Sequence, residues 1–467
     1  MKLKFIGATE TVTGSKHLIM TEKGKQILLD CGMYQGMGKE THELNRHLSV
    51  NPSNIEAVIL SHAHIDHSGN LPYLVQQGFT GKIYCTPATY DVCKLLLMDS
   101  AHIQENDIAY INKRRVKRGM PLIKPLYTTK DVERCLKYFK PIPYDAEFNL
   151  NDEISFHFTN VGHIIGSASV TITSHESDKK IKLTFTGDVG RYNDLILKAP
   201  QPFQQSDYII CESTYGDRLH DHFTDAENKL LNIVSNTCVK KKGKLIIPAF
   251  SLGRTQEIVY VLDRLNHKNL LHDIKVYVDS PLSTAVTDVV IKHSESYNDA
   301  FREYLKVDKS LFGFENLKYI QNADESKALN TSNEPCIIIS ASGMADAGRV
   351  KHHIMHAVSD EKNTILIVGY CSPRTLGANL LEGKKQVHIY GDYYDVKADV
   401  ESIHSYSAHA DYSELIQFLS CQEKEKVKTI FLVHGEEHPK LSFKEKLIAE
   451  GFKQITIPKK SSVYDLS

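Results

Sequence analysis

The sequence predicts an α/β protein with two sheet-containing domains, and three features of its 467 residues support that prediction. The length leaves room for two or three domains, because a domain usually holds about 100–200 residues. In the first 212 residues, short runs such as QILLDCG and KLTFTGD are bounded by turn residues, which indicates strands of a sheet with one buried face. After residue 213, runs such as KLIIPAF and PCIIISAS are almost continuously apolar, which is typical of a parallel sheet covered by helices on both faces.

The first part of the chain should hold many strands and two helices. An amphipathic helix is expected over residues 88–118, and it ends in a basic run of five residues. Thr128 and Asp131 have the spacing of a capping box, so a second helix is expected from there through Phe139. The expected strands are MKLKFIGA, KHLIMT, QILLDCG, AVILSH, KIYCT, EISFHFT, ASVTITS, KLTFTGD and YIICEST, and the basic run is Lys113, Arg114, Arg115, Lys117 and Arg118.

The second part should form the parallel sheet. Three of its strands run directly into a small-residue turn and a helix start, at residues 251–254, 342–349 and 372–374. After about residue 404 we expect a helix from Asp411 to Leu419, a strand TIFLVHG, another helix and a final strand near ITIP. The strands expected in the parallel sheet are KLIIPAF, IKVYVDS, PCIIISAS, TILIVGY and QVHIYGD.

Composition excludes several classes of protein. Hydrophobic residues make up 41% and charged residues 24%, so the chain is not mainly disordered. No apolar run reaches the roughly 18 residues of a membrane helix, and the N-terminus lacks the apolar core of a secretion signal, so a cytoplasmic protein without a membrane partner is expected. The nine cysteines are scattered and form no C-x-x-C pair, which favours reduced core thiols. A net charge of -1 means that any polyanion must be bound by local charge.

One short segment carries the strongest chemical signal. His62, His64, Asp66 and His67 follow the apolar strand AVILS and supply nitrogen and oxygen ligands that suit zinc. In an extended loop, residues 62 and 64 point to one side while 66 and 67 can turn to another, so one segment could serve two metal ions. A surface cluster of histidines is the alternative. It is disfavoured because further isolated candidates, His163 and Asp188, also follow strands and have glycine neighbours.

Taken in this order, these residues resemble the metallo-β-lactamase superfamily, in which two sheets form a sandwich with helices outside and a binuclear metal site at one edge. The resemblance implies two Zn²⁺ per chain, with Mn²⁺ as the alternative, since histidine and carboxylate ligands accept both. By the resemblance, His62, His64 and His163 would bind one ion, Asp66 and His67 would bind the other, and Asp188 would bridge the two. It also implies a catalytic carboxylate that orients the histidine loop, namely Asp30 in LLDCG.

Three later motifs resemble those of the β-CASP nucleases, in which a second domain is inserted into the first. Glu212 in ESTYG matches the acidic motif, His409 in SAHAD the middle histidine, and His434 in LVHGE the last histidine, which would complete the second metal. The implied fold is an αββα metallo-β-lactamase sandwich with an inserted parallel-sheet α/β (β-CASP) domain. The sandwich would comprise residues 1–212 and 405–467, and the insert residues 213–404.

The motifs are closest to those of the endonuclease subunit of the pre-mRNA 3′-end cleavage factor and its bacterial homologues. This implies a metal-dependent endoribonuclease that leaves 5′-phosphate and 3′-hydroxyl ends, with hydroxide activated by two metals and with Asp66, Glu212 and His409 as catalytic residues, His409 being the general acid. Two alternatives stand beside it. A small-molecule (thio)ester hydrolase would leave Glu212 and His409 without a task, and a non-catalytic RNA-binding subunit would not need the complete ligand set.

Single-stranded RNA is the expected partner, and a homodimer is one assembly the chain could form. Helix N-termini with an arginine in the first turns suit phosphate oxygens, and three turns of the second part have this pattern. Each such pair taken singly is more often a helix cap with a surface salt bridge. The basic run at 113–118 could also follow RNA, although a solvated helix end explains it equally well. The expected phosphate-binding pairs are Ser251 with Arg254, Ser342 with Arg349, and Ser372 with Arg374.

Overall fold

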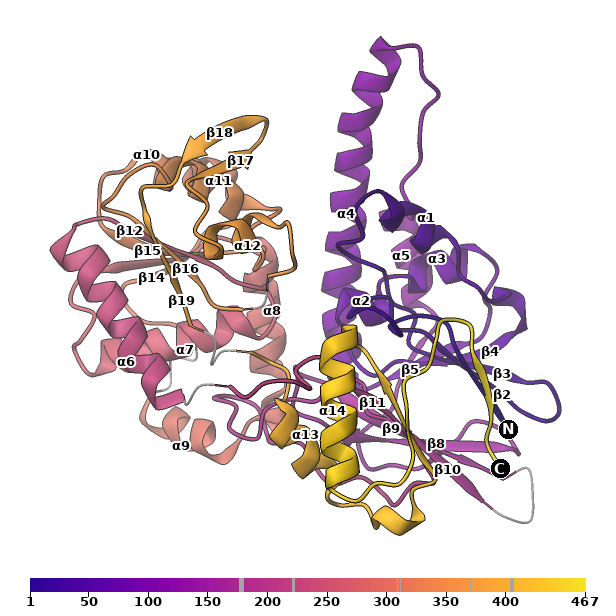
Figure 1. Ribbon diagram of the computed structural model, residues 1–467. Coiled ribbons are helices and arrows are strands. Elements are labelled where there is room, and N and C mark those ends of the chain that lie inside the picture. The colour runs from indigo at the N-terminus through magenta and orange to yellow at the C-terminus, as the bar shows by residue number, and fades with distance from the viewer. Residues whose placement is uncertain (176–179, 221–222, 309, 311, 370, 404–406) are drawn as a thin grey trace. The chain divides into compact units, whose positions relative to one another are not determined.

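The computed structural model describes residues 1–175, 180–220, 223–308, 310, 312–369, 371–403 and 407–467 (Figure 1). These residues form two compact units. The first unit combines Met1–Leu219 with His409–Ser467, and the second is His220–Ala408. The chain therefore leaves the first unit and returns to it. This division into units does not test the domain boundaries expected after residues 212 and 404, which stay a prediction.

The first sheet of the first unit has seven strands. Its last four strands in spatial order are parallel to one another, whereas the first three pairings are antiparallel. The strands, in spatial order, are Val463–Asp465 (β22), Lys2–Phe5 (β1), His17–Met20 (β2), Gln26–Leu29 (β3), Ile55–Ile59 (β4), Lys82–Cys85 (β5) and Phe139–Pro141 (β6).

The second sheet also has seven strands and packs face to face against the first. Phe5 and Ile27 of the first sheet share one buried apolar core with Phe156, Val170 and Phe431 of the second. The four strands at one side of the second sheet are parallel, so their carboxyl ends lie at the same edge. In spatial order the strands are Ile455–Thr456 (β21), Thr429–Val433 (β20), Tyr208–Glu212 (β11), Ile181–Phe185 (β10), Ala168–Ser174 (β9), Ile154–Asn160 (β8) and Phe148–Asn149 (β7).

Helices cover the outer faces of this sandwich. Phe418 of α13 (Tyr412–Leu419) and Phe443 of α14 (Glu437–Ala449) pack with Leu432 in a second core on the far side of the second sheet. The resulting order of layers is the predicted αββα sandwich. The remaining helices of the unit are Thr41–Arg46 (α1), Ile65–Ser68 (α2), Leu71–Gln76 (α3), Pro87–Lys117 (α4) and Thr129–Leu136 (α5), with short 3₁₀ turns at Gly38–Glu40, Pro52–Asn54 and Lys424–Lys426.

The second unit is built on a six-stranded sheet in which every described pairing is parallel, as predicted. Its central strands are buried along almost their whole length. A parallel sheet needs crossovers that place helices on its faces, and this explains the continuous apolar runs. The strands, in spatial order, are Leu317–Tyr319 (β14), Lys275–Val278 (β13), Cys336–Ser340 (β15), Lys244–Pro248 (β12), Thr364–Ile367 (β16) and Asp399–Ser402 (β19).

Helices pack on this sheet through apolar side chains. Ile354 and Leu380, for example, share a core with Ile246, Ile338 and Ile365 of the strands. The helices of this unit are Phe223–Val234 (α6), Arg254–His267 (α7), Pro281–Lys292 (α8), Asp299–Val307 (α9), Ala323–Thr331 (α10), Arg349–Ala357 (α11) and Leu376–Leu381 (α12), with a π-helical turn at Ser235–Lys240 and a 3₁₀ turn at Ser294–Ser296.

The expectation for the run QVHIYGD is wrong in one respect. Gln386–Ile389 (β17) does not join the parallel sheet but forms a two-stranded antiparallel hairpin with Asp392–Asp395 (β18). The loop residues Tyr390 and Gly391 both have positive φ angles, 53° and 108°, as a tight hairpin turn requires. The short local turn therefore decides the pairing of this run.

Two helix expectations also need correction. The long helix α4 is not amphipathic over its length, because its buried residues end at Ala101 and the remaining turns leave the body of the unit. The capping box at Thr128 and Asp131 is confirmed, but α5 ends at Leu136. Phe139 instead begins β6, which pairs with β5. Among the described residues, α4 included, no helix is both long and apolar enough to cross a membrane.

Several strands of two to four residues were not predicted from the sequence, namely β6, β7, β14, β18 and β19. The strand near ITIP is present as β21 but is not the final one. β22 follows it and pairs with β1, so the two ends of the chain meet in the first sheet. Such short strands lack enough residues to show a period of two.

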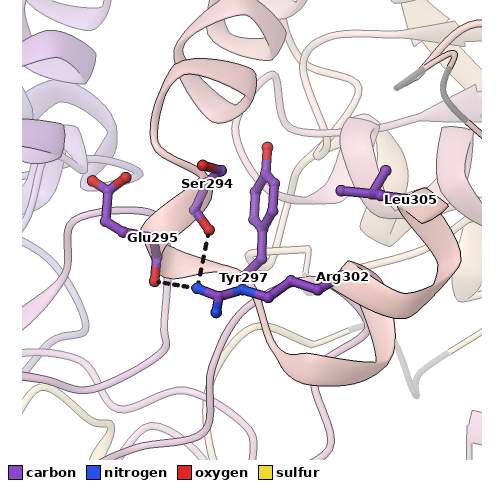
Figure 2. Close-up of a pocket in the computed structure, with 5 residues that line it drawn as sticks. All are labelled: Ser294, Glu295, Tyr297, Arg302 and Leu305. Atoms are coloured by element: carbon purple, nitrogen blue, oxygen red, sulfur yellow. Dashed lines mark hydrogen bonds between the residues drawn. The ribbon is translucent and has the colours of Figure 1, made fainter.

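A cavity of about 360 Å³ lies in the second unit (Figure 2). Its wall includes Arg302, whose guanidinium donates hydrogen bonds to the carbonyl oxygens of Ser294 (3.3 Å) and Glu295 (3.2 Å). Tyr297 and Leu305 complete the lining. None of these residues belongs to the predicted site, so the chemistry has to be sought elsewhere.

A buried polar network joins three elements of the second unit. Asp279, which follows β13, accepts hydrogen bonds from Arg349 (2.6 Å), His353 (2.7 Å) and Ser326. Burial alone would raise the pKa of Asp279, but these hydrogen bonds lower it below its usual value. His353 also contacts Asn330 through its other ring nitrogen, at 2.7 Å. The network therefore ties α10 and α11 to the end of β13.

We expect Asp279→Ala to destabilise the chain by about 3–5 kcal/mol, because it leaves the buried His353 and the partly buried Arg349 guanidinium without their carboxylate partner. The matched control is Glu325→Ala, which removes an exposed ion pair with Lys318 and should cost less than about 1 kcal/mol. Urea unfolding followed by circular dichroism measures both, since the chain has no tryptophan. Equal effects of the two variants would contradict the prediction.

Candidate metal centre

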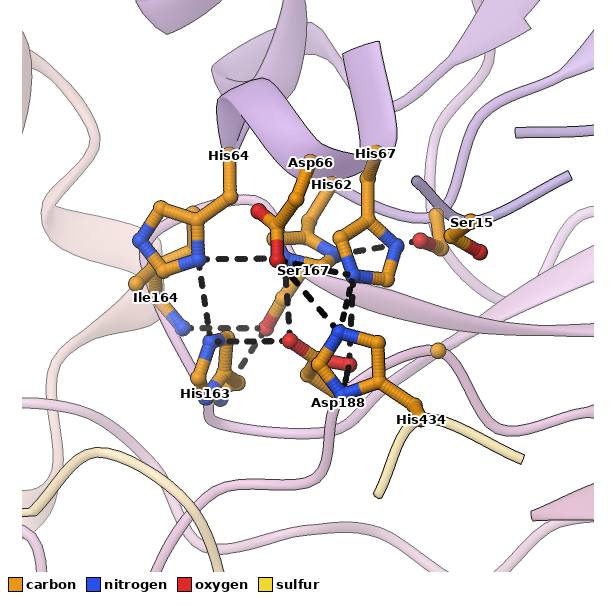
Figure 3. A network of polar contacts seen from close by, with 12 residues as sticks. Ser15, His62, His64, Asp66, His67, His163, Ile164, Ser167, Asp188 and His434 are labelled. Atoms are coloured by element: carbon orange, nitrogen blue, oxygen red, sulfur yellow. Dashed lines mark hydrogen bonds and ion pairs between the residues drawn. The ribbon is translucent and has the colours of Figure 1, made fainter. Parts of the chain in front are cut away.

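The predicted ligands lie in the first unit, at the carboxyl ends of strands from both sheets. His62 and His64 follow β4, and Asp66 and His67 lie on the single turn of α2. The other three come from the second sheet: His163 follows β8, Asp188 follows β10 and His434 follows β20. Figure 3 shows their imidazole and carboxylate groups pointing toward one another.

The first group of ligand atoms comprises His62, His64, His163 and Asp188, all within 4.8 Å of one another. His64 Nδ1 lies 3.2 Å from His62 Nε2 and 3.2 Å from His163 Nε2. Asp188 Oδ2 lies 3.5 Å from His62 Nε2 and 3.6 Å from His163 Nε2. Four donors thus surround one point.

The second group comprises Asp66, His67 and His434. His434 Nε2 lies 3.2 Å from His67 Nε2 and 3.4 Å from Asp66 Oδ2. The other carboxylate oxygen of Asp188, Oδ1, faces this group at 3.3 Å from His67 Nε2 and 3.5 Å from His434 Nδ1. Asp188 therefore lies between the two groups with one oxygen toward each.

These spacings fit metal ions. Ligand atoms about 2.0–2.1 Å from a tetrahedral zinc ion are about 3.3 Å from one another, which is close to the nitrogen–nitrogen distances of 3.2 Å in both groups. In addition, Asp188 Oδ1 is buried and has no hydrogen-bond partner among the described residues. A buried carboxylate oxygen without a hydrogen bond is costly unless a cation binds it. The His/Asp cluster is thus suited to a metal site.

The electrostatics of His62, His64 and Asp188 agree with this use. Burial lowers the pKa of His64 to about 4 and that of His62 well below its usual value, so both imidazoles are neutral, as metal ligands must be. Burial alone would raise the pKa of Asp188, but His434, His67 and His62 hold it well below its usual value. The carboxylate is therefore ionised at neutral pH.

Asp30, placed directly after β3, holds the loop that carries the ligands. Its Oδ2 accepts a hydrogen bond from His67 Nδ1 at 2.6 Å and from the Ser61 hydroxyl at 2.9 Å, while Oδ1 accepts the Ser61 backbone N–H at 2.8 Å. These contacts orient His67 Nε2 toward the centre. Close backbone packing supports them, because a Cβ on Gly32 would lie only 1.6 Å from the carbonyl oxygen of Asp66.

His409 and Glu212 lie beside the cluster. His409 Nδ1 contacts the two oxygens of Glu212 at 3.2 and 3.3 Å and lies 4.0 Å from Asp188 Oδ2. Burial opposes protonation, but the carboxylates of Glu212, Asp188 and Asp66 raise the pKa of His409 to about 9. Nearby cations would lower this value.

Three supporting hydroxyls were not predicted from the sequence. Thr214 donates to Glu212 Oε2 at 2.6 Å and contacts His434 Nδ1 at 3.1 Å, so it links the last two motifs. Ser61 contacts His62 Nδ1 at 3.0 Å, and Ser167 accepts the backbone N–H of His163 at 3.0 Å. All three stand within one to four residues of a predicted site residue, and that proximity was the only available signal.

The predicted phosphate-binding residues lie apart from this cluster in the sequence, all in the second unit. The turns that hold Ser251, Ser342 and Ser372 follow β12, β15 and β16, which are adjacent parallel strands, so the three turns share one edge of the sheet. Arg374 is exposed there and has a positive φ of 72°.

Two of the three arginines face protein carboxylates instead. The Arg254 side chain is 6% exposed and pairs with Glu257, and Arg349 donates to Asp279 and to the carbonyl oxygen of Gln321 at 2.7 Å. For Arg254 and Arg349, the structure therefore agrees with the alternative reading, in which each residue forms a salt bridge near a helix start. Phosphate binding at this edge stays a prediction.

Three protein-family descriptions match successive parts of the chain. The description Metallo-beta-lactamase superfamily matches residues 17–237, Beta-Casp domain matches residues 255–380, and Zn-dependent metallo-hydrolase RNA specificity domain matches residues 393–458. The chain belongs to the metallo-β-lactamase superfamily, among the members that carry a Beta-Casp domain.

Individual relatives are similar to this chain over most of its length. The chain is 31% identical to Ribonuclease TTHA0252 of Thermus thermophilus over 97% of its own length and 95% of the relative's. It is 31% identical to an RNase J-like protein of Methanocaldococcus jannaschii (94% of each chain) and 29% identical to cleavage and polyadenylation specificity factor 73 of Drosophila melanogaster (94% of this chain, 60% of the relative). A crystal structure of a protein of unknown function from Enterococcus faecalis V583 has the same fold (TM-score 0.54, 12% identity, covering 100% of this chain and 99% of that one).

Removing the charge of Asp30 should weaken metal binding. We expect Asp30→Asn to lower metal affinity about 10–100-fold, because the amide cannot hold His67 in the same way. The control is Asp91→Asn, which changes another buried aspartate that forms an ion pair with Lys94 (2.6 Å) on α4. Competition with a chelator, read by metal analysis, gives the affinities. Unchanged retention in Asp30→Asn would contradict the role of this carboxylate.

Proposed function

We propose that this protein is a metal-dependent endoribonuclease that cleaves single-stranded RNA. The observation that carries the proposal is the double cluster centred on Asp188 with the His409–Glu212 pair beside it, all within one unit. The names of the relatives, Ribonuclease TTHA0252 among them, and the match to an RNA specificity domain at residues 393–458 support RNA as the substrate.

The ligands divide between two cations. His62, His64 and His163 would hold one, and Asp66, His67 and His434 the other, with Asp188 bridging them. Zinc suits this donor set, and manganese is the alternative. When bound, a pair of such ions supplies an activated nucleophile and neutralises charge on the phosphoryl oxygens.

The protein's own residues supply orientation and a proton. Glu212 accepts the Nδ1 hydrogen of His409 and thereby fixes the ring, so that Nε2 is the atom that would protonate the departing 3′ oxygen. Thr214 and the backbone N–H of Val189 in turn hold the Glu212 carboxylate. Proton delivery to the 3′ oxygen leaves a 3′-hydroxyl on one product and a 5′-phosphate on the other.

The cellular setting is part of the proposal. The cysteines are all free, which fits a reducing compartment such as the cytoplasm. Assembly into a homodimer stays a prediction.

We expect His409→Ala to reduce RNA cleavage by about 10²–10⁴-fold, the contribution of a positioned general acid. Metal content should stay unchanged, because His409 lies outside both ligand groups. The matched control is His438→Ala, which removes an 82%-exposed histidine paired with Asp217. Cleavage of an internally labelled single-stranded RNA measures the rates. Full activity of His409→Ala would refute the assignment.

Metal removal tests the centre directly. We expect about two metal ions per chain after purification at neutral pH without chelator, loss of cleavage on chelation, and recovery on addition of zinc or manganese. Mass spectrometry should find 5′-phosphate ends on internal fragments. Intact RNA beside a hydrolysed thioester would instead indicate a small-molecule hydrolase, and RNA binding without metal or cleavage would indicate a non-catalytic subunit.

A further inference from the structure

The second half of α4 and the segment that returns from it form a projection of the first unit, here called the arm, residues 103–124 (Figure 1). None of the described arm residues is buried, and several apolar side chains are strongly exposed, including Tyr110 (58%), Val116 (65%) and Leu122 (63%). An exposed apolar surface of this kind indicates an interaction site.

The arm has a defined structure. Asn112 exchanges two hydrogen bonds with the backbone of Ile123 (2.9 and 3.0 Å), and Arg115 Nε donates to the carbonyl oxygen of Pro121 at 2.6 Å. At the base of the return segment, Arg46 donates to the carbonyl oxygens of Lys124 (2.7 Å) and Pro125 (3.2 Å). The return segment is thus fixed against one face of the helix.

The opposite face of the helix is basic. At 3.6 residues per turn, the five side chains of this face, which are named at the end of this paragraph, lie within about 140° of one another around the helix axis. Asn112 and Arg115 instead point toward the return segment. The guanidinium of Arg114 lies over the Tyr110 ring, 4.8 Å from its centroid. The five members of this basic face are Tyr110, Lys113, Arg114, Lys117 and Arg118.

No carboxylate neutralises this face. The sequence has no acidic residue between Asp107 and Asp131. Within the described part of the chain, Lys113, Arg114, Lys117 and Arg118 have no ion-pair partner within 4.0 Å, whereas many other surface lysines do, Lys318 with Glu325 for example.

We propose that the basic face of the arm binds the backbone of a single-stranded RNA at a distance from the site of cleavage. Four cations on one face suit a phosphate chain, and an arginine-backed tyrosine offers a surface for base stacking. A second copy of the chain is a poorer occupant, because two such faces repel each other. The choice of RNA over another polyanion rests on the proposed function.

The arm is connected to the metal centre through its own helix. Near the start of α4, the Thr89 hydroxyl donates to the carbonyl oxygen of Gly166 at 2.8 Å, in the loop that carries His163. Lys113 lies 24 residues further along, about 36 Å at 1.5 Å per residue. An RNA of about four nucleotides, about 14 Å long when stacked at about 3.4 Å per nucleotide and about twice as long when fully extended, would not span that distance. The arm should therefore affect long substrates only.

The test replaces Lys113, Arg114, Lys117 and Arg118 by glutamine and keeps Asn112 and Arg115, which hold the return segment. A control variant replaces four exposed lysines of the second unit, so that the change in net charge is equal: Lys229, Lys240, Lys242 and Lys362. Circular dichroism and thermal unfolding check that both variants fold as the wild type does.

Binding to a long single-stranded RNA is measured in chelator, so that no cleavage occurs. The arm variant should bind at least about 10-fold more weakly, and its slope of log K against log salt should be smaller by about 3, at about 0.7 per phosphate contact. With metal present, it should raise KM for the long RNA without changing kcat, and leave cleavage of the four-nucleotide RNA unchanged.

Unchanged RNA binding in the arm variant, or an equal loss in the control variant, would overturn the proposal. A changed sedimentation coefficient with normal RNA binding would also overturn it, and would identify the arm as a protein contact. Because binding is measured without metal, an arm-dependent affinity in a protein that fails to cleave RNA would leave this inference standing and refute only the nuclease function.

Discussion

The structure of the first unit depends on one buried carboxylate, that of Asp188. It lies among six imidazoles and two further carboxylates, and its two oxygens face two different groups of donors. Without cations, such a concentration of buried polar groups would be costly, since ionised groups lose several kcal/mol on burial and Oδ1 has no hydrogen bond. Bound metal would resolve that conflict. The binding of metal and the stability of the surrounding loops are therefore linked.

Backbone packing brings these groups together. The ligands come from four loops at the ends of strands in both sheets, and the loops approach more closely than side chains would allow. A Cβ on Gly190 would lie 2.1 Å from the carbonyl oxygen of Gly162, and one on Gly187 2.8 Å from Ser61. The backbone N–H of Ala168 donates to the carbonyl oxygen of Ser61 at 2.9 Å and so joins the two sheets behind the ligands. Glycine at these points serves packing as well as turn formation.

Much of this fold could be predicted from local patterns. Apolar runs of five to seven residues identified the strands that carry Asp30, Asp188 and Glu212, because a buried strand has to be apolar along one or both faces. The hairpin β17–β18 was assigned wrongly because its pairing depends on the backbone conformation of Tyr390 and Gly391, which an apolar run does not reveal. Likewise, α4 appeared amphipathic because the sequence does not show that the helix leaves the body after Ala101.

The sequence predicted the site residues of the first unit better than those of the second. In the first unit, ligand identity follows from the residue types in HxHxDH, and the structure brings those residues together; their metal roles remain a proposal. In the second unit, the same reasoning from helix starts and arginines took no account of Glu257 and Asp279, which lie 3 and 70 residues from the arginines they pair with. An arginine paired with a carboxylate has little net charge to offer a phosphate. In a chain with a net charge of -1, affinity for RNA then depends on cations that no carboxylate neutralises, and the described structure concentrates four of these on the arm. Affinity and cleavage would thus reside in different parts of the molecule, which lets each vary without loss of the other.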